Sequence, residues 1–181
     1  MEHPRECHIL PPGPGDALAL AEVHVRAWRE TYAGLLPALL LDRMSVPLHA
    51  RRWRAILTSE RPKETVLCVE GPKGILGYCA ADTQGGSALV STLYLVREAQ
   101  GQGLGRALLS AQARLQASRG ARALRLWMLE GNHRARGFYE RLGGLAGERR
   151  ALRGWGQGQH EIAFDWPNIG SLIGPVTSSR P

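Results

Sequence analysis

The chain has 181 residues, of which 44% are hydrophobic and 22% charged, so it can bury one sizeable core and form a single compact domain. Its apolar stretches are far shorter than the roughly 18 consecutive apolar residues that a membrane-spanning helix needs. The N-terminus lacks the apolar segment of a signal peptide. We therefore expect a cytoplasmic protein with no membrane partner.

The cysteines and histidines give no sign of a metal site. The chain has three cysteines, an odd number without CxxC spacing, which also argues against a disulfide framework. The histidines are scattered without the spacing of metal ligands. We expect reduced cysteines and no bound metal.

The positive charge is concentrated in one part of the chain. Between Arg97 and Arg153 there are twelve arginines and four glutamates, a net of +8, whereas the whole chain carries +7. Such a segment suits an acidic ligand or nucleic acid. Because no aromatic residues alternate with the arginine pairs, we expect no nucleic-acid partner.

The first half of the chain predicts strands and helices in alternation. Apolar residues recur at three- and four-residue spacing after Asp16, a candidate N-cap, which predicts a helix that ends near Gly34. Two β-rich runs around Gly71–Gly74 predict an antiparallel hairpin. The expected elements are a strand over 7–10, this helix, a second helix over 48–57, strands over 65–70 and 75–81, and a loop over 82–87.

The second half continues with a strand over 89–95, a glycine-rich loop, and a helix from Leu104 to near Gly120 with an apolar stripe at i, i+3, i+4, i+7. A strand over 123–129 and a short helix that ends at Gly143 follow. Two further strands, over 147–152 and 160–165, predict a closing hairpin across residues 153–158. Residues 167–181 are rich in Gly, Ser and Pro, and we expect a weakly ordered tail.

The glycine-rich loop predicts an anion site. Gly101, Gly103 and Gly105 alternate between a strand and a helix, so several backbone N–H groups are free and lie at the positive end of the helix dipole. A P-loop is excluded because Gly105 is followed by Arg106 and not by Lys-Ser/Thr. The dinucleotide pattern GxGxxG is excluded because neither position 106 nor position 108 is glycine.

The remaining pattern, Gln100-x-x-Gly103-x-Gly105, resembles the cofactor loop of the GNAT superfamily of acetyl-CoA-dependent N-acetyltransferases. A second segment, from Asn132 to Gly143, resembles the family motif N-x-x-A-x-x-F/L-Y-E-x-L-G-F, and Gly144 replaces its last aromatic residue. The resemblance implies an α/β fold, with one GNAT-type domain over residues 7–166 and a mixed, largely antiparallel sheet flanked by helices.

The resemblance also implies acetyl-CoA as co-substrate and a set of site residues. The backbone of the strand over 93–95 would face the pantetheine arm and the acetyl group, and the loop over 100–106 would wrap the pyrophosphate. Asn132 would hold the cofactor, and the Tyr139 hydroxyl would donate a proton to the departing thiolate, which makes Tyr139 the catalytic candidate. The implied cofactor-binding residues are Leu93, Tyr94, Leu95, Gln100, Gly101, Gln102, Gly103, Leu104, Gly105, Arg106, Asn132 and Tyr139.

The acceptor side is less determined. Trp28, Tyr32 and Trp127 are candidates for the acceptor pocket, with ordinary packing as the alternative for each. Some family members carry a glutamate that acts as the general base at the position of Trp127. Because tryptophan cannot accept the proton, the identity of the general base in this chain is undetermined. It is an ordered water chain, a carboxylate such as Glu30 or Glu130, or none at all if the acceptor amine already has a low pKa.

The implied function is transfer of acetyl to a primary amine. A small-molecule amine, an antibiotic-like polyamine, and a protein N-terminus or lysine all fit, and a homodimer is common for the fold. Trp127 makes a ribosomal-protein acceptor less favoured. A non-catalytic acyl-CoA-binding regulator is the main alternative, and a basic nucleic-acid-binding module is the third.

Overall fold

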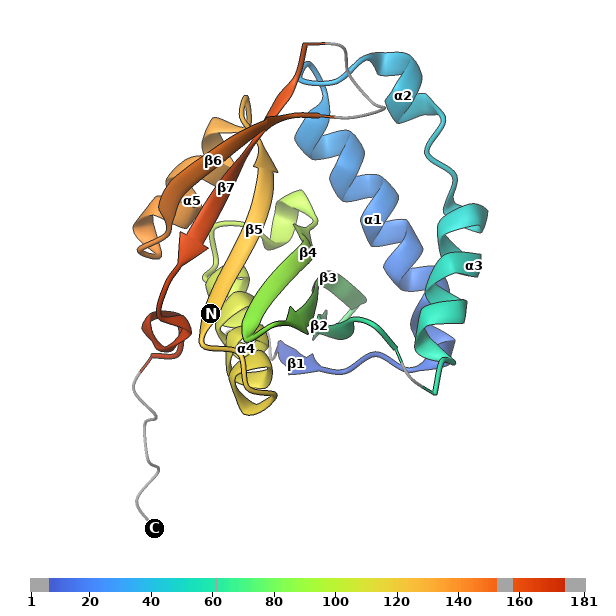
Figure 1. The fold of residues 1–181 in the computed structure, drawn as a ribbon. Coiled ribbons are helices and arrows are strands. Elements are labelled where there is room, and N and C mark those ends of the chain that lie inside the picture. Colours follow the sequence, from blue (N-terminus) through green and yellow to red (C-terminus); the bar gives the residue numbers. More distant parts are fainter. Residues whose placement is uncertain (1–6, 61, 153–157, 175–181) are drawn as a thin grey trace, which may run out of the picture.

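The computed structural model describes residues 7–60, 62–152 and 158–174, which form one seven-stranded sheet with helices on both faces (Figure 1). The strands lie in the order β1-β2-β3-β4-β5-β7-β6. Only the β4–β5 pair among them is parallel, so the expected mixed, largely antiparallel sheet is confirmed. The strands are β1 (His8–Leu10), β2 (Thr65–Gly71), β3 (Gly74–Gln84), β4 (Ser87–Leu95), β5 (Ala123–Leu129), β6 (Leu145–Ala151) and β7 (His160–Trp166).

Two groups of helices cover the two faces of the sheet (Figure 1). The helices are α1 (Ala17–Tyr32), α2 (Ala38–Asp42), α3 (Val46–Leu57), α4 (Leu104–Ser118) and α5 (His133–Arg141), with 3-10 turns η1 (Pro14–Asp16), η2 (Arg97–Ala99) and η3 (Ile169–Leu172). Leu108 and Leu109 of α4 pack with Leu126 of β5 in one core. Leu20 of α1 and Trp53 of α3 pack on the opposite face. No helix in the described ranges has the length and apolarity needed to cross a membrane.

The parallel pair at the centre of the sheet is short. β4 and β5 pair from Ser87 to Val90, and beyond this point β4 follows β3 while β5 follows β7. The β3–β4 register shifts here. Ala80 pairs with Thr92 and Ala81 pairs with Val90, so Ser91 is the extra residue of a β-bulge and has no paired residue in β3. Such a bulge bends and twists its strand. The edge of β4 beyond Val90 therefore has no strand beside it.

The structure differs from the expected elements in three places, of which two lie in the first half of the chain. The expected loop over 82–87 is a tight hairpin, because β3 and β4 are joined by Gly85 and Gly86 alone, with φ of +55° and +81°. Two positive φ angles are what a two-residue hairpin turn requires, and glycine adopts them readily. The short helix α2, between the two expected helices, was not expected.

The segment after β7 also differs from the expected weakly ordered tail in its first part. Residues 169–172 form η3, which contacts α4. Ile169 and Leu172 are buried in the main core. The apolar side chains therefore outweigh the Gly-, Ser- and Pro-rich composition here. Residues 175–181 of the expected tail, and most of the loop over 153–158, lie outside the described residues.

Gly144 shows why one motif position departs from the family pattern. A Cβ atom on Gly144 would lie 2.6 Å from Cζ2 of Trp166 and 3.0 Å from Cδ1 of Phe164. Both rings belong to β7 and are fully buried. The Trp166 indole N–H also donates to the Leu142 carbonyl at 2.9 Å. Trp166 therefore fills the space beside this turn, and a side chain at position 144 has no room.

We predict that Gly144→Ala lowers the free energy of unfolding by about 1–3 kcal/mol, because the Trp166 ring must move to admit the methyl group. For a domain of this size, the melting temperature should fall by roughly 3 to 10 °C in a thermal unfolding experiment. Gly15→Ala is the matched control, since no atom lies within 4 Å of its Cβ position. An equally small effect of both substitutions would contradict the packing argument.

Candidate active site

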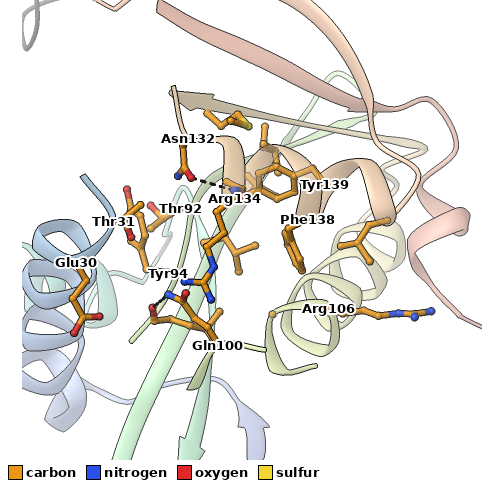
Figure 2. Close-up of a pocket in the computed structure, with 18 of the residues that line it drawn as sticks. Glu30, Thr31, Thr92, Tyr94, Gln100, Arg106, Asn132, Arg134, Phe138 and Tyr139 are labelled. Atoms are coloured by element: carbon orange, nitrogen blue, oxygen red, sulfur yellow. Dashed lines mark hydrogen bonds between the residues drawn. The ribbon is translucent and has the colours of Figure 1, made fainter. Parts of the chain in front are cut away.

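A cavity of about 880 Å³ opens where β4 and β5 diverge (Figure 2). Its walls come from the end of α1, the second half of β4, the glycine loop, the middle of β5 and one face of α5. The bulge at Ser91 and the loss of pairing after Val90 create this space, so the cavity is a consequence of the sheet geometry. A volume of this size suits a ligand of several hundred daltons.

The glycine loop forms one end of the cavity. Gly101 and Gly103 have φ of +78° and +79°, which favours glycine, and Gly103 is the N-cap of α4. The N–H groups of the next three residues, 104–106, make no hydrogen bond within the part of the chain that the structure describes. Free N–H groups at the positive end of a helix dipole are the geometry that an anion cradle requires.

Two arginines near the glycine loop direct their side chains differently. The side chain of Arg106 points away from the cavity, whereas that of Arg134 points into it, toward Gln100 and Tyr94 (Figure 2). Arg106 therefore contributes its backbone N–H. Arg134 was not singled out in the sequence, although its place two residues after Asn132 in the motif is a signal that could have identified it.

Two loop residues expected at the site do not line the cavity with their side chains. The Gln102 amide is exposed and donates to the Glu98 carbonyl at 2.6 Å. Leu104 packs against the cores on both faces of the sheet. Gln100 does line the cavity, and its amide donates to the Leu95 carbonyl at 2.8 Å, which ties the start of the loop to the end of β4.

The close approach of α4 to α5 places the opposite wall. A Cβ atom on Gly105 would lie 3.3 Å from Cζ of Phe138, so glycine allows the two helices to pack tightly. Asn132 caps α5, with its side-chain oxygen accepting from the Ala135 N–H at 3.1 Å. The Asn132 amide nitrogen makes no hydrogen bond within the described ranges, and the residue lines the cavity.

Tyr139 lies on the inner face of α5 and is 8% exposed. It lines the cavity, and its hydroxyl makes no hydrogen bond to any described residue. Burial raises the pKa of Tyr139 well above its usual value, with smaller contributions from Tyr32 and Cys79. The hydroxyl is therefore neutral at physiological pH and can donate a hydrogen bond into the cavity.

The wall formed by β4 is supported by a cluster of half-buried aromatic residues. Tyr94 lines the cavity, and its hydroxyl accepts from the Trp28 indole N–H at 2.7 Å. Trp28 is not among the lining residues, whereas Tyr32, one turn further along α1, is. Burial raises the pKa of both Tyr32 and Tyr94. Of the two aromatic candidates on α1, the structure brings Tyr32 to the cavity and places Trp28 behind it.

Behind this cluster lies His24, which is held neutral. Its Nδ1 lies 2.5 Å from the Tyr78 hydroxyl, and its ring stacks on His49 with centroids 4.2 Å apart. Burial lowers the pKa of His24 to about 3, with smaller contributions from His49 and Arg52. A neutral, hydrogen-bonded support keeps the Tyr94 side of β4 rigid without adding charge to the cavity.

The two carboxylates considered as bases are both engaged. Glu30 lines the cavity, but one oxygen accepts from Arg26 Nε at 2.9 Å and the other from the Arg97 backbone N–H at 2.8 Å. Glu130 is not a lining residue, and its pairing with Arg149 at 3.0 Å lowers its pKa. Among the residues that line the cavity, Glu30 is the one acid.

Trp127 forms a wall on the β5 side. It lines the cavity, and the guanidinium of Arg150 lies over its ring, 3.7 Å from the centroid. Arg150 is held there by Glu161, whose carboxylate accepts from Nε at 2.8 Å.

Within the described ranges, no three His, Cys, Asp or Glu side chains are grouped so that they could hold a metal ion.

Comparison with known proteins agrees with this geometry. A sequence model of the family described as "Acetyltransferase (GNAT) domain" matches residues 62–143, which include the loop, β5 and α5. YuaI of Bacillus subtilis (strain 168), described as an uncharacterized N-acetyltransferase, is 26% identical over 166 residues, 87% of this chain and 91% of YuaI.

Two solved structures share the fold. PaiA N-acetyltransferase from Thermoplasma acidophilum, in complex with coenzyme A, has a TM-score of 0.71 at 17% identity, covering 89% of this chain and 99% of that one. YncA from Salmonella typhimurium, with its cofactor acetyl-CoA, has a TM-score of 0.66 at 18% identity, covering 91% and 94%. The family match over residues 62–143, the relative and the shared fold all support the GNAT superfamily of acetyltransferases for this chain.

Proposed function

We propose that the protein transfers an acetyl group from acetyl-CoA to a primary amine, by direct attack of the amine on the thioester. One observation carries the proposal. The free N–H groups at the start of α4, the unpaired edge of β4 and the unpartnered hydroxyl of Tyr139 all border the same cavity. We assign residues 7–166 to one catalytic domain, because α1 supplies a wall of this cavity and lies outside the stretch that matches the family model.

The residues present fit acetyl-CoA. The N–H groups of 104–106 would hold the diphosphate, and Arg134 adds a cation beside them. The amide groups of the pantetheine arm would pair with the free edge of β4 over Leu93–Leu95, in the manner of an added strand. The Asn132 amide nitrogen is free to donate to the same arm. When bound, acetyl-CoA supplies an acyl group activated as a thioester.

Tyr139 is the catalytic residue in this proposal. Negative charge develops on the sulfur as the thiolate departs, and a neutral hydroxyl close to the sulfur stabilises that charge by donating a hydrogen bond or a proton. The raised pKa keeps Tyr139 in its donor form. Burial also removes water that would weaken the interaction.

The acceptor enters beside Tyr32 and Trp127 in this proposal. Aromatic walls suit the apolar part of an amine, and they leave the amine nitrogen to reach the thioester. Both oxygens of Glu30 are engaged, and Glu130 lies outside the lining. The acceptor therefore attacks in its neutral form, and its own amine pKa governs how much of it is reactive.

We predict that acetyl-CoA stabilises the protein through the glycine loop. At a concentration of about 100 times its dissociation constant, acetyl-CoA should raise the free energy of unfolding by about 2.7 kcal/mol. The melting temperature should then rise by roughly 5 to 10 °C. Gly103→Glu should abolish this shift by blocking the cradle. Gly86→Glu is the matched control, since both glycines have φ near +80° with open space around them but Gly86 is not among the residues that line the cavity. A shift with ATP or NAD in place of acetyl-CoA would overturn the proposal.

We predict that Tyr139→Phe lowers turnover by about two to three orders of magnitude and leaves acetyl-CoA affinity within about twofold. Turnover is measured as release of free thiol with an amine panel: an alanine-initiated peptide, a lysine peptide with a blocked N-terminus, spermidine and an aminoglycoside. Near-normal turnover in the variant would remove Tyr139 from the mechanism. Tight acetyl-CoA binding without turnover on any amine by the wild-type protein would favour the non-catalytic regulator.

We predict that the pH dependence follows the acceptor. At saturating acetyl-CoA, kcat/KM for the amine should rise with pH and level off near the amine's own pKa, about 8 for a peptide N-terminus and about 10.4 for lysine. Because the pKa of Tyr139 is raised, its donor form persists and causes no decline below pH 10. The same apparent pKa for two acceptors of different basicity would instead indicate a base on the protein.

A further inference from the structure

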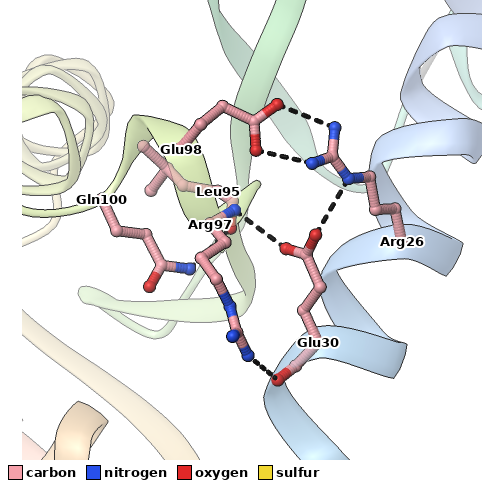
Figure 3. Close-up of polar contacts among 6 residues, drawn as sticks. All are labelled: Arg26, Glu30, Leu95, Arg97, Glu98 and Gln100. Atoms are coloured by element: carbon pink, nitrogen blue, oxygen red, sulfur yellow. Dashed lines mark hydrogen bonds and ion pairs between the residues drawn. The ribbon is translucent and has the colours of Figure 1, made fainter.

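We infer that Arg26, Glu30, Arg97 and Glu98 form a polar clamp that positions the glycine loop against α1, and that Glu30 acts as a positioning residue and not as the general base (Figure 3). The inference rests on the proposed function, because the loop it positions is the proposed acetyl-CoA site. Arg26 and Glu30 belong to α1, and the other two belong to η2, the turn that leads into the loop.

The first half of the clamp is a bidentate ion pair. Arg26 donates from Nη1 and Nη2 to the two oxygens of Glu98, at 2.8 and 2.6 Å, and from Nε to Glu30 at 2.9 Å. One guanidinium therefore bridges two carboxylates from segments 72 and 4 residues away in sequence. Planar bidentate geometry makes such a pair directional as well as attractive.

The second half holds the backbone of η2. The Arg97 N–H donates to the free oxygen of Glu30 at 2.8 Å, and the Arg97 guanidinium donates to the Glu30 carbonyl at 3.3 Å. The Gln102 amide donates to the Glu98 carbonyl at 2.6 Å, which extends the network into the loop itself. The loop is thus tied to α1 through side chains and backbone together.

The clamp connects the two halves of the proposed site. Glu30 directly precedes the Thr31–Tyr32 pair, which lines the cavity at the end of α1, while Glu98 lies three residues before Gly101. The clamp therefore sets the position of the cradle relative to the acceptor-side wall. A preorganised cradle binds its anion more tightly, because less ordering is left to occur on binding.

The clamp is separable from folding. Val96, the residue before η2, and Ala99, the last residue of η2, are buried in the core beneath α1. They hold η2 against the sheet whether or not the clamp forms. Ion pairs between side chains that are half exposed contribute little to overall stability, so loss of the clamp should change the loop and leave the fold intact.

The geometry also excludes Glu30 as a free base. Each of its oxygens already accepts a hydrogen bond from the clamp, and an approaching ammonium group would have to displace one of them. A base that loses its positioning contacts whenever it takes a proton would release the loop during catalysis. Positioning and proton transfer are therefore alternatives for this residue.

The test compares Glu98→Gln and Glu30→Gln with Asp165→Asn. The control removes another bidentate pair, in which Arg125 donates from Nε and Nη2 to the two oxygens of Asp165 at 2.6 and 3.0 Å, and neither of its residues lines the cavity. By calorimetry, we expect both clamp variants to bind acetyl-CoA about fivefold more weakly and the control to stay within about twofold. Melting temperatures without ligand should stay within about 3 °C of wild type.

Two further readouts separate the outcomes. Hydrogen exchange of ligand-free protein should speed up over residues 97–103 in both clamp variants and not in the control. With the best amine of the panel, both clamp variants should raise KM for acetyl-CoA and keep kcat within about twofold. A fall in kcat of about 100-fold in Glu30→Gln alone would show that Glu30 is the base and overturn the inference.

Unchanged affinity and unchanged exchange in both clamp variants would overturn the clamp while leaving the proposed function standing. Failure of the wild-type protein to bind acetyl-CoA would overturn the proposed function, and the exchange experiment would still decide whether the four residues hold the loop. The two failures are therefore distinguishable.

Discussion

The divergence of β4 from β5 is the constraint on which the site depends. Four residue pairs hold the two strands together, and beyond Val90 their backbone groups face open space and not each other. Unpaired backbone groups are unfavourable unless water or a ligand bonds to them. The sheet therefore leaves an edge inside the protein that an extended, amide-bearing ligand can complete. In the proposed function, this recognition would use the backbone and leave the side chains around it to serve the acceptor.

The rest of the structure keeps that opening rigid. A neutral cluster around His24 and Tyr78 supports β4 from behind, and the close packing of α4 on α5 through Gly105 brings Tyr139 to the other side. Rigid secondary elements hold reacting groups more accurately than loops do. The loop from Gly101 to Gly103 follows a turn that is anchored by buried apolar residues and by an ion pair and a hydrogen bond to α1.

The net charge of the basic segment, residues 97–153, does not show which of its arginines are available to a ligand. Four of its arginines that the structure describes are paired with carboxylates from within the same segment or from β7. The pairs are Arg125 with Glu148 and Asp165, Arg136 with Glu140, Arg149 with Glu130, and Arg150 with Glu161. Arg134 instead directs its charge into the cavity. A net charge predicts an anionic ligand in general, but only the pairing decides which cations are available to it.

The sequence by itself determined what depends on neighbours along the chain. The order of the strands, the helices other than α2 and the glycine loop into α4 follow from local patterns, because a helix start or a glycine turn is set within a few residues. Only the tertiary structure decided which side chains reach the cavity. Trp28 lies behind Tyr94, Gln102 faces solvent and Glu30 is held by Arg97, and each of these placements depends on segments far apart in sequence or on how an exposed loop lies. Local propensity carries no information about such partners, since packing of the complete sheet and its helices sets them.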